Sequence, residues 1–231
     1  MELNSCLIRM GLTSNEATLY RTLSMHGEMT GYECAKLTGI SRSNVYLALA
    51  GLCEKGAAFT VDGTVQKYSP APIREFCANK RREFEAAANY VLEHMPLPTT
   101  PSSAYITITG AVAIIDKMKN MIDACVERVY ISADTTVLTK VAAELADVIE
   151  RGLKVVVMTD HECNLNGAIM YGITRKDGQV RLIVDSHFVL TGDIADNRPC
   201  SCLFSSSETL VSLFKDAMKN EIRLIELGEL K

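Results

Sequence analysis

The sequence predicts an α+β N-terminal region of three helices and a β-hairpin, then one long helix, then an α/β domain. Helix-boundary signals recur through residues 1–71, and an apolar heptad pattern runs through residues 72–95. Strand-like and helix-like segments alternate through residues 104–231, as in an α/β domain. The proline- and Ser/Thr-rich residues 96–103 are typical of a linker, so we expect four segments with these boundaries.

Two capping boxes open the first two helices. Thr13 is followed three residues later by Glu16, and Thr30 is followed three residues later by Glu33. The boxes predict a helix over roughly residues 14–26 and a second helix that ends at a glycine. The residues expected to face inward are Ala17, Leu19, Tyr20 and Leu23 in the first helix and Cys34 and Leu37 in the second.

A third helix follows a short turn, residues 38–41, which has the length and the glycine of a helix-turn-helix. Ser41 is expected to cap this helix, which runs to about Glu54. The inward residues are Val45, Leu49 and Leu52, whereas Arg42, Asn44 and Ala48 lie off that face.

Two strand-like segments, residues 58–61 and 65–68, follow the third helix. They flank Asp62 and Gly63, which are a strong signal for a tight hairpin turn. Three helices followed by a hairpin form a winged helix-turn-helix, a fold that places its third helix in the DNA major groove.

The predicted DNA-reading surface combines the start of the third helix with the hairpin wing. An Arg side chain can fork to guanine and an Asn side chain to adenine, while hydroxyls reach bases or phosphates. Charge is distributed accordingly, because residues 1–82 hold 10 Lys/Arg against 7 Asp/Glu, and residues 83–231 hold 14 against 21. The candidate double-stranded DNA contacts are Ser41, Arg42, Ser43, Asn44, Tyr46, Thr64, Gln66 and Lys67.

Four short motifs in this region resemble the TrmB family of transcriptional regulators. They are GLTSNEA at residues 11–17, GISRSNVY at 39–46, LCEKG at 52–56 and KYSP at 67–70. Cys53 departs from the pattern, which more usually has a polar residue there. The resemblance implies a winged helix joined to a helical dimerisation segment and often to a sensor domain. The alternative is a winged helix that binds protein instead of DNA.

The long helix, residues 72–95, carries a heptad seam that predicts a homodimer. A two-fold pair of winged helices reads two half-sites, which strengthens this prediction. The alternative is an amphipathic helix folded against its own domain. The seam positions are Ile73, Cys77, Lys80, Phe84, Ala87, Val91 and His94, of which Lys80, Ala87 and His94 are poor seam residues.

The order of strands and helices after residue 104, with His187 late in it, resembles the phospholipase D-like domain that many TrmB proteins carry. A phosphodiesterase of that type needs a lysine two residues after its histidine nucleophile, where this chain has Val189. The matching aspartate, Asp193, stands one position short. We therefore predict a domain that is not an enzyme, and the alternative is a phospholipase D-like nuclease tethered to DNA.

Polar residues at the predicted strand ends are the candidates for binding a small effector. They are Ser132, Asp134, Thr159, Asp160, Asp185 and His187. A competing hypothesis is a metal or thiol sensor, because four soft ligands suit tetrahedral zinc. Those weaker candidates are His161, Cys163, Cys200 and Cys202.

The remaining expectations concern the compartment. The first residues show no basic segment followed by an apolar one, and the chain has no apolar run of the roughly 18 residues that a bilayer requires. The eight cysteines are scattered, as in a reduced protein. We expect a cytoplasmic protein with no membrane partner and no cofactor.

Overall fold

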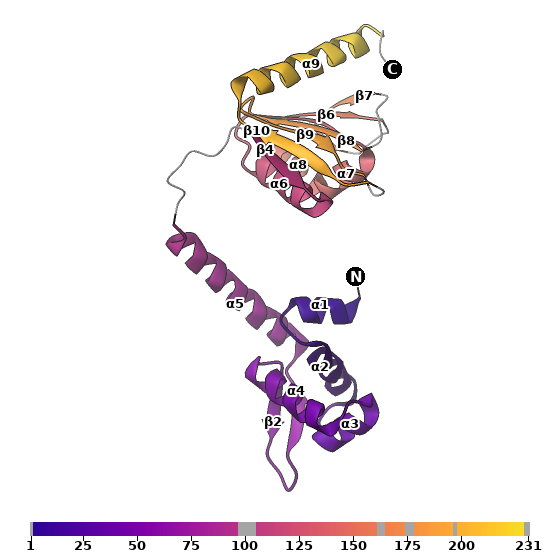
Figure 1. Ribbon diagram of the computed structural model, residues 1–231, viewed down its shortest axis with the longest axis vertical. Coiled ribbons are helices and arrows are strands. Elements are labelled where there is room, and N and C mark those ends of the chain that lie inside the picture. Colours follow the sequence, from indigo (N-terminus) through magenta and orange to yellow (C-terminus); the bar gives the residue numbers. More distant parts are fainter. Residues whose placement is uncertain (1, 97–104, 161–164, 174–177, 196–197, 229–231) are drawn as a thin grey trace. The chain divides into compact units, whose positions relative to one another are not determined.

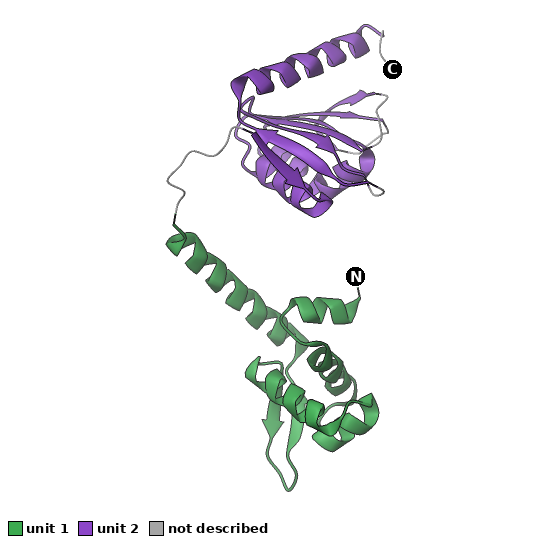
Figure 2. Ribbon diagram, viewed as in Figure 1, with its two compact units in different colours: residues 1–98 green, residues 99–231 purple. Residues whose placement is uncertain are grey.

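The computed structural model describes residues 2–96, 105–160, 165–173, 178–195 and 198–228. The chain divides into two compact units, residues 1–98 and residues 99–231 (Figure 2). Unit 1 is the winged helix-turn-helix with the long helix, and unit 2 is the α/β domain, so the predicted fold class is confirmed.

Unit 1 contains five helices and a three-stranded antiparallel sheet of order β1-β3-β2 among its described residues (Figure 1). The helices are α1 (Leu3–Arg9), α2 (Ser14–His26), α3 (Gly31–Thr38), α4 (Arg42–Glu54) and α5 (Ile73–His94). The strands are β1 (Met29–Thr30), β2 (Ala58–Val61) and β3 (Lys67–Pro70). The first helix and the first strand were not predicted from the sequence.

Both predicted capping boxes form. Thr13 Oγ1 accepts from the backbone N–H of Glu16 at 3.3 Å, and the Glu16 carboxylate accepts from the Thr13 N–H at 2.7 Å. Thr30 and Glu33 make the same reciprocal pair at the start of α3. Ser41 was wrongly predicted to cap α4 through its side chain, because its Oγ lies 3.3 Å from Ser43 Oγ and makes no capping bond.

Glu16 also ties α2 to the end of α4. Lys55 Nζ donates to Glu16 Oε2 at 2.6 Å and to the carbonyl of Gly11 at 2.9 Å. Burial alone would raise the pKa of the Glu16 carboxyl, but the hydrogen bonds from Lys55 and Thr13 outweigh burial and lower it. Gly51 makes room for this carboxylate, since a Cβ at Gly51 would collide with Glu16 Oε1.

The first turn of α5 is anchored in the core of unit 1. Phe76 is fully buried, and its ring lies 5.4 Å from that of Tyr20, whose hydroxyl donates to the Ala71 carbonyl at 3.0 Å. The inward residues predicted for α2 and for α4 are all buried. Two predictions were wrong: Leu37 is 56% exposed, and Ala48 is buried.

Unit 2 is a seven-stranded mixed sheet of order β4-β10-β9-β8-β5-β6-β7. Helices α6–α8 cover one face and α9 covers the other (Figure 1). The strands are β4 (Tyr105–Thr109), β5 (Arg128–Ser132), β6 (Lys154–Thr159), β7 (Ile169–Gly172), β8 (Gln179–Val184), β9 (Phe188–Asp193) and β10 (Ser201–Ser205). The helices are α6 (Ala111–Asp123), α7 (Thr135–Lys140), α8 (Ala142–Glu150) and α9 (Glu208–Glu226).

The apolar run in β6 is explained by its position, because this strand pairs in parallel with both β5 and β7 and is buried along most of its length. The segment predicted as one helix, residues 136–151, is two helices that break at Val141. Within the part of the chain that the structure describes, no helix is long and apolar enough to cross a bilayer.

Candidate functional site

The five predicted contact residues of the third helix lie together at the start of α4. Ser41, Arg42, Ser43 and Asn44 are exposed, and the Tyr46 side chain is 50% exposed. The buried Val45 separates Asn44 from Tyr46 and anchors this turn in the core. The helix therefore presents guanidinium, amide and hydroxyl groups to solvent while its opposite face packs in the core.

Contacts between α3 and α4 fix the orientation of two of these side chains. The Arg42 guanidinium carbon lies 4.8 Å from the centroid of the Tyr32 ring, a cation–π contact. The Tyr46 ring packs so closely on Gly31 that a Cβ there would lie 2.6 Å from the ring. Tyr32 was missed by sequence reasoning, and its only signal was an exposed aromatic residue in the first turn of α3.

The wing has a wider loop than its sequence predicted. The strands end at Val61 and resume at Lys67, so five residues connect them instead of a two-residue Asp62-Gly63 turn. Thr64 and Gln66 lie exposed in this loop. Lys67 is exposed at the start of β3, opposite Thr30 of β1.

Lys67 acts electrostatically on the first turn of α3. The pKa of the Glu33 carboxyl is lowered first by hydrogen bonds from Thr30 and to a smaller extent by the positive charge of Lys67. Because Lys67 pairs with Thr30 in the sheet, the wing cation is close to the start of α3, and the predicted residues of the wing and α4 belong to one compact unit.

The predicted effector residues do not come together. Ser132 and Thr159 are buried at the carboxyl ends of β5 and β6, and Asp160 is exposed just beyond. Asp134 caps α7 by accepting from the backbone N–H of Val137 at 2.8 Å. These four residues share one edge of the sheet because β5 and β6 are parallel.

Asp185 and His187 lie at the opposite edge, because β8 runs antiparallel to β5 and pairs Val184 with Val129. The five-residue β5 separates the two edges by about 13 Å at roughly 3.3 Å per residue. Asp185 accepts from the backbone N–H groups of residues 126, 127 and 128 at 2.9, 2.8 and 2.9 Å, and from Cys125 Sγ at 3.3 Å. The six candidate residues therefore lie at two opposite edges of the sheet and do not line one pocket.

The structure offers a different small cavity beside Asp185. It has a volume of about 190 Å³ and lies between α6 and the strands β8–β10. The Phe188 and Phe204 rings stack with centroids 5.9 Å apart, and Lys117 Nζ lies 3.9 Å from the Phe204 centroid. Asn120 adds an amide to this lining. Sequence reasoning missed these residues because they come from three distant segments.

The position of the missing catalytic lysine is occupied by a core residue. Val189 is fully buried and packs in the cluster beneath α9. His187 is exposed in the β8–β9 turn, and Asp193 ends β9, one strand length away. This arrangement brings no cation to His187 from position 189.

The metal candidates are only partly described. His161 and Cys163 lie outside the described residues. Cys202 is buried, and burial first, then Asp193, raises the pKa of its thiol to about 11, which disfavours the thiolate that binds metal. Cys200 Sγ lies 3.3 Å from the Ala195 carbonyl. The described part of the chain contains no group of three or more His, Cys, Asp or Glu side chains arranged for a metal.

A winged helix-turn-helix with an exposed polar recognition helix defines a class of transcriptional regulators. The family model described as "Sugar-specific transcriptional regulator TrmB" matches residues 7–74. The model described as "Transcriptional regulator TrmB, EBD N-terminal subdomain" matches residues 104–216. The two matches together span most of the chain, and the chain belongs to the TrmB family of transcriptional regulators.

One curated protein is a relative of this chain at low sequence identity. The uncharacterized protein YrhO of Bacillus subtilis (strain 168) is 28% identical over 156 residues, which cover 66% of this chain and 56% of YrhO. This chain thus spans little more than half the length of that curated relative.

Two solved structures resemble this chain at lower sequence identity. TrmBL2, an archaeal chromatin protein whose structure shows a novel mode of DNA binding, is 17% identical with a TM-score of 0.43, covering 94% of this chain and 96% of TrmBL2. NucT from Helicobacter pylori is 13% identical with a TM-score of 0.44, covering 52% of this chain and 95% of NucT.

Proposed function

We propose that this chain is a homodimeric, sequence-specific DNA-binding regulator whose unit 2 binds a small effector. The observation that carries the proposal is the start of α4, where four consecutive polar residues and Tyr46 are exposed while Val45 fixes the turn in the core. The family membership and the excess of basic residues in residues 1–82 support it.

Arg42 and Asn44 are the proposed base-reading residues. The guanidinium presents paired N–H donors that match guanine, and the amide matches adenine. The Tyr32 ring limits the freedom of the Arg42 side chain, so less conformational entropy is lost when the guanidinium meets a base. Lys67 and Gln66 of the wing are proposed to contact the phosphate backbone, which adds affinity without sequence information.

Binding to a duplex selected from a random-sequence library tests these roles. Arg42→Ala should cost about 1–3 kcal/mol and relax the preference at one base pair. Lys67→Ala should weaken binding to all sequences and reduce the slope of log K against log salt by about 1. Lys140→Ala, which removes an exposed charge from unit 2, is the matched control. Unchanged affinity and specificity in both unit 1 variants would refute the proposed surface.

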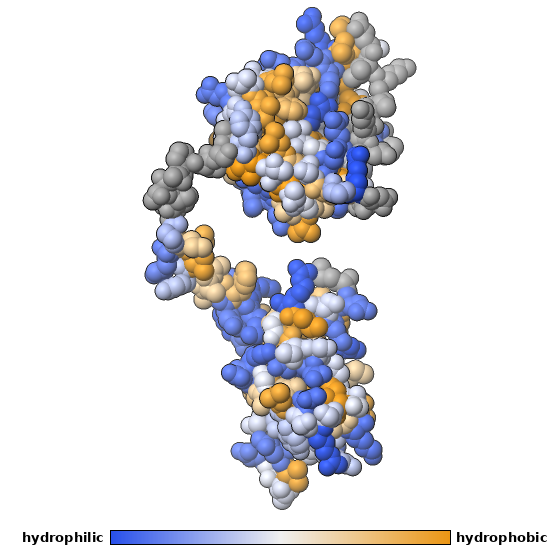
Figure 3. All heavy atoms as spheres, in the orientation of Figure 1, coloured by the Kyte–Doolittle hydropathy of each residue, from blue (hydrophilic) through white to orange (hydrophobic). Residues whose placement is uncertain are grey.

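The dimer is proposed to form through α5. Beyond Phe76 this helix presents apolar side chains to solvent, with Phe84 76% and Val91 52% exposed. Figure 3 shows hydrophobic surface along the C-terminal half of this helix. Phe84→Glu should yield a monomer in analytical ultracentrifugation, because the dimer would then bury two uncompensated carboxylates at the seam. Leu92→Glu, at an exposed position outside the seam, should leave the dimer intact.

Effector binding is proposed at the cavity lined by Lys117, Asn120, Phe188 and Phe204. Its volume of about 190 Å³ is below the roughly 300–1,000 Å³ of drug-sized pockets, so it suits one small ring. An aromatic face beside a cation and an amide fits a sugar or a sugar phosphate, in line with the sugar-specific description of the family.

A thermal-shift screen of monosaccharides and their phosphates tests this site. A ligand present at 100 times its Kd should stabilise unit 2 by about 2.7 kcal/mol. Phe188→Ala should abolish that stabilisation and leave DNA binding without ligand unchanged. A ligand that still binds this variant occupies another site.

We further propose that unit 2 performs no phosphodiester chemistry and that the protein acts in the cytoplasm, where its DNA lies. The buried Val189 at the position of the lysine supports this, since an alkyl side chain cannot neutralise a phosphoryl transition state. Hydrolysis of bis(p-nitrophenyl) phosphate that disappears in His187→Ala would instead favour a nuclease.

A further inference from the structure

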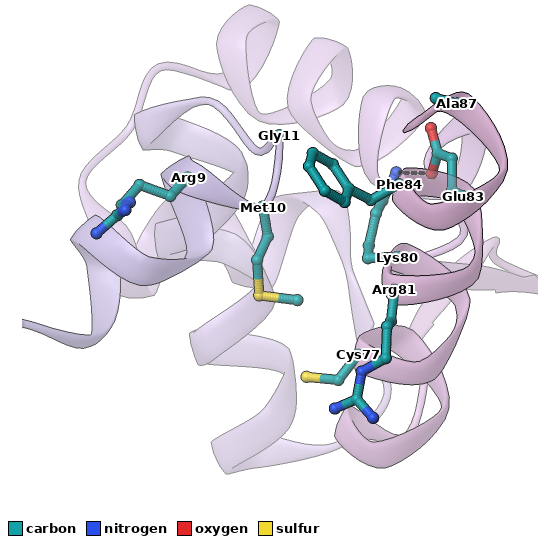
Figure 4. Close-up of a pocket in the computed structure, with 9 residues that line it drawn as sticks. All are labelled: Arg9, Met10, Gly11, Cys77, Lys80, Arg81, Glu83, Phe84 and Ala87. Atoms are coloured by element: carbon teal, nitrogen blue, oxygen red, sulfur yellow. Dashed lines mark hydrogen bonds and ion pairs between the residues drawn. The ribbon is translucent and has the colours of Figure 1, made fainter. Parts of the chain in front are cut away.

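An open groove runs along α5 within unit 1. Its volume is about 690 Å³, and one wall is α5 from Cys77 to Ala87, while the other is the end of α1 with the following turn, residues 9–11. Figure 4 shows the Phe84 ring reaching toward Gly11 and the Met10 and Cys77 side chains pointing toward each other. The middle of the heptad seam, from Cys77 to Ala87, therefore faces an open groove.

Gly11 leaves that second wall open. Its φ is +97°, and a Cβ built on it would meet no atom within 4 Å. No side chain blocks the groove at Gly11, so a helix from another copy can approach the Gly11 backbone closely. The space along the Cys77–Ala87 face suits an element with small and medium apolar side chains.

The rims of the groove are basic, whereas the far half of α5 is acidic. Arg9, Lys80 and Arg81 line the groove, with Glu83 as its one acidic residue among those described. Residues 74–82 of α5 hold four basic residues and one acidic residue, a net charge of +3. Residues 83–95 hold three acidic residues and no Lys or Arg, a net charge of −3.

We infer that two copies of the chain pair their α5 helices antiparallel, so that the C-terminal half of each helix fills the groove of the other. The inference rests on the proposed dimer and specifies its geometry. Each +3 half then faces a −3 half, and the exposed Val91 and Tyr90 of one copy are covered by the groove of its partner. A two-fold axis satisfies both grooves at once, as an isologous interface requires.

The heptad positions allow this pairing in one centred register. Antiparallel coiled coils match a positions with d positions, so Phe84 lies opposite the partner's Ala87, and Lys80 opposite the partner's Val91. A large ring then meets a small side chain at both ends of this contact. The axis passes between residues 85 and 86, midway along the part of α5 that extends beyond Phe76.

A parallel pair has the opposite electrostatics. It places +3 against +3 and −3 against −3 along the same seam, and repulsion between facing like charges destabilises such pairs. It also leaves each groove between α1 and α5 without an occupant, because the partner's N-terminal half is tied to its own winged helix by the buried Phe76.

Charge reversal separates the two geometries. Lys80→Glu with Arg81→Glu changes the net charge of residues 74–82 from +3 to −1. The dissociation constant of the antiparallel dimer should therefore rise at least about tenfold. Adding Glu85→Lys and Glu93→Lys should restore the dimer, because −1 then faces +1. Lys140→Glu in unit 2 is the control. A double variant that dimerises as well as the unmodified chain would overturn the inference.

Photo-cross-linking gives a second measurement that does not depend on repulsion. p-Benzoylphenylalanine replacing Tyr90 should link to a peptide containing residues 9–11 or 80–84 of a second copy. Links to residues 88–95 of the second copy would overturn the antiparallel geometry and leave the dimer proposal standing. A chain that is monomeric in ultracentrifugation yet shifts its DNA would overturn both the pairing and the dimer, while the DNA-binding proposal would stand.

Discussion

The start of α4 and the strand ends of unit 2 carry similar polar residues, yet the two regions use them differently. On α4, Arg42 and Asn44 are exposed and extend from a helix that is anchored by its apolar face. In unit 2, Asp134 and Asp185 accept hydrogen bonds from backbone N–H groups, so their carboxylates help to hold loops in place. A polar side chain without such a task is available to a ligand.

The sharpest test of this contrast is the loss of the Asp185 carboxylate. Asp185→Ala should destabilise unit 2 by about 2–4 kcal/mol, because three backbone N–H groups at the start of β5 lose a charged acceptor. Chemical denaturation followed by circular dichroism measures the change. Asp134→Asn is the matched control, since Asn caps a helix as well as Asp does. Equal stabilities for Asp185→Ala and the control would remove the contrast.

On the other side of the comparison, Asn44→Ala should weaken binding to the selected duplex by about 1–3 kcal/mol. Its stability should stay within about 0.5 kcal/mol of the parent, because the side chain is exposed on α4. Fluorescence anisotropy and a thermal melt on the same sample give both values. A variant that loses stability and keeps its affinity would place Asn44 among the structural residues.

The stability of unit 2 should also depend on pH through Asp185. Burial alone would raise the pKa of this carboxyl, but hydrogen bonds from the N–H groups of Arg128, Val126 and Glu127 outweigh it and lower the pKa below 3.8. A group with a lowered folded-state pKa stabilises the fold above its ordinary pKa. That stabilisation is lost as the pH falls through 3.8 toward the folded-state value.

Asp185→Asn isolates this contribution from those of other carboxyl groups. The difference in unfolding free energy between the parent and this variant should be constant near pH 7 and should shrink below about pH 4. Asn also tolerates the left-handed backbone at this position, where φ is +51°. A pH-independent difference would mean that the carboxylate charge contributes nothing.

The smallest expected effect is that of His187→Ala. The side chain is exposed in the β8–β9 turn, so the stability of unit 2 should change by no more than about 0.5 kcal/mol. DNA binding should not change. A large loss of stability or of DNA binding would show that the exposure of a side chain in unit 2 does not predict how much it contributes.

Local signals predicted most of the fold. Capping boxes at Thr13 and Thr30 placed α2 and α3, and the apolar run of β6 indicated a buried parallel strand. The sequence did not predict α1, which starts without a side-chain cap, or β1, which has two residues. It also placed the wing turn at Asp62-Gly63, although the sheet register closes the hairpin only at Val61 and Lys67.

The candidate sites divide in the same way. The α4 residues were identifiable because the helix period separates their face from the core. Asp185 was not recognisable as a structural residue, since its donors lie 57 to 59 positions earlier in the chain. Glu16 illustrates the same limit: its capping box is local, but Lys55 lies 39 residues away.

The packing of Glu16 against Gly51 constrains the order in which substitutions at these two positions can be accepted during evolution. Alanine at position 51 would favour the helix by about 1 kcal/mol, but its methyl group would collide with Glu16 Oε1, so the Glu16 carboxylate would have to shift. Once residue 16 has become smaller, the same substitution in α4 turns from harmful to favourable. The two sites are therefore epistatic, and lineages that keep Glu16 are expected to keep glycine near the end of α4.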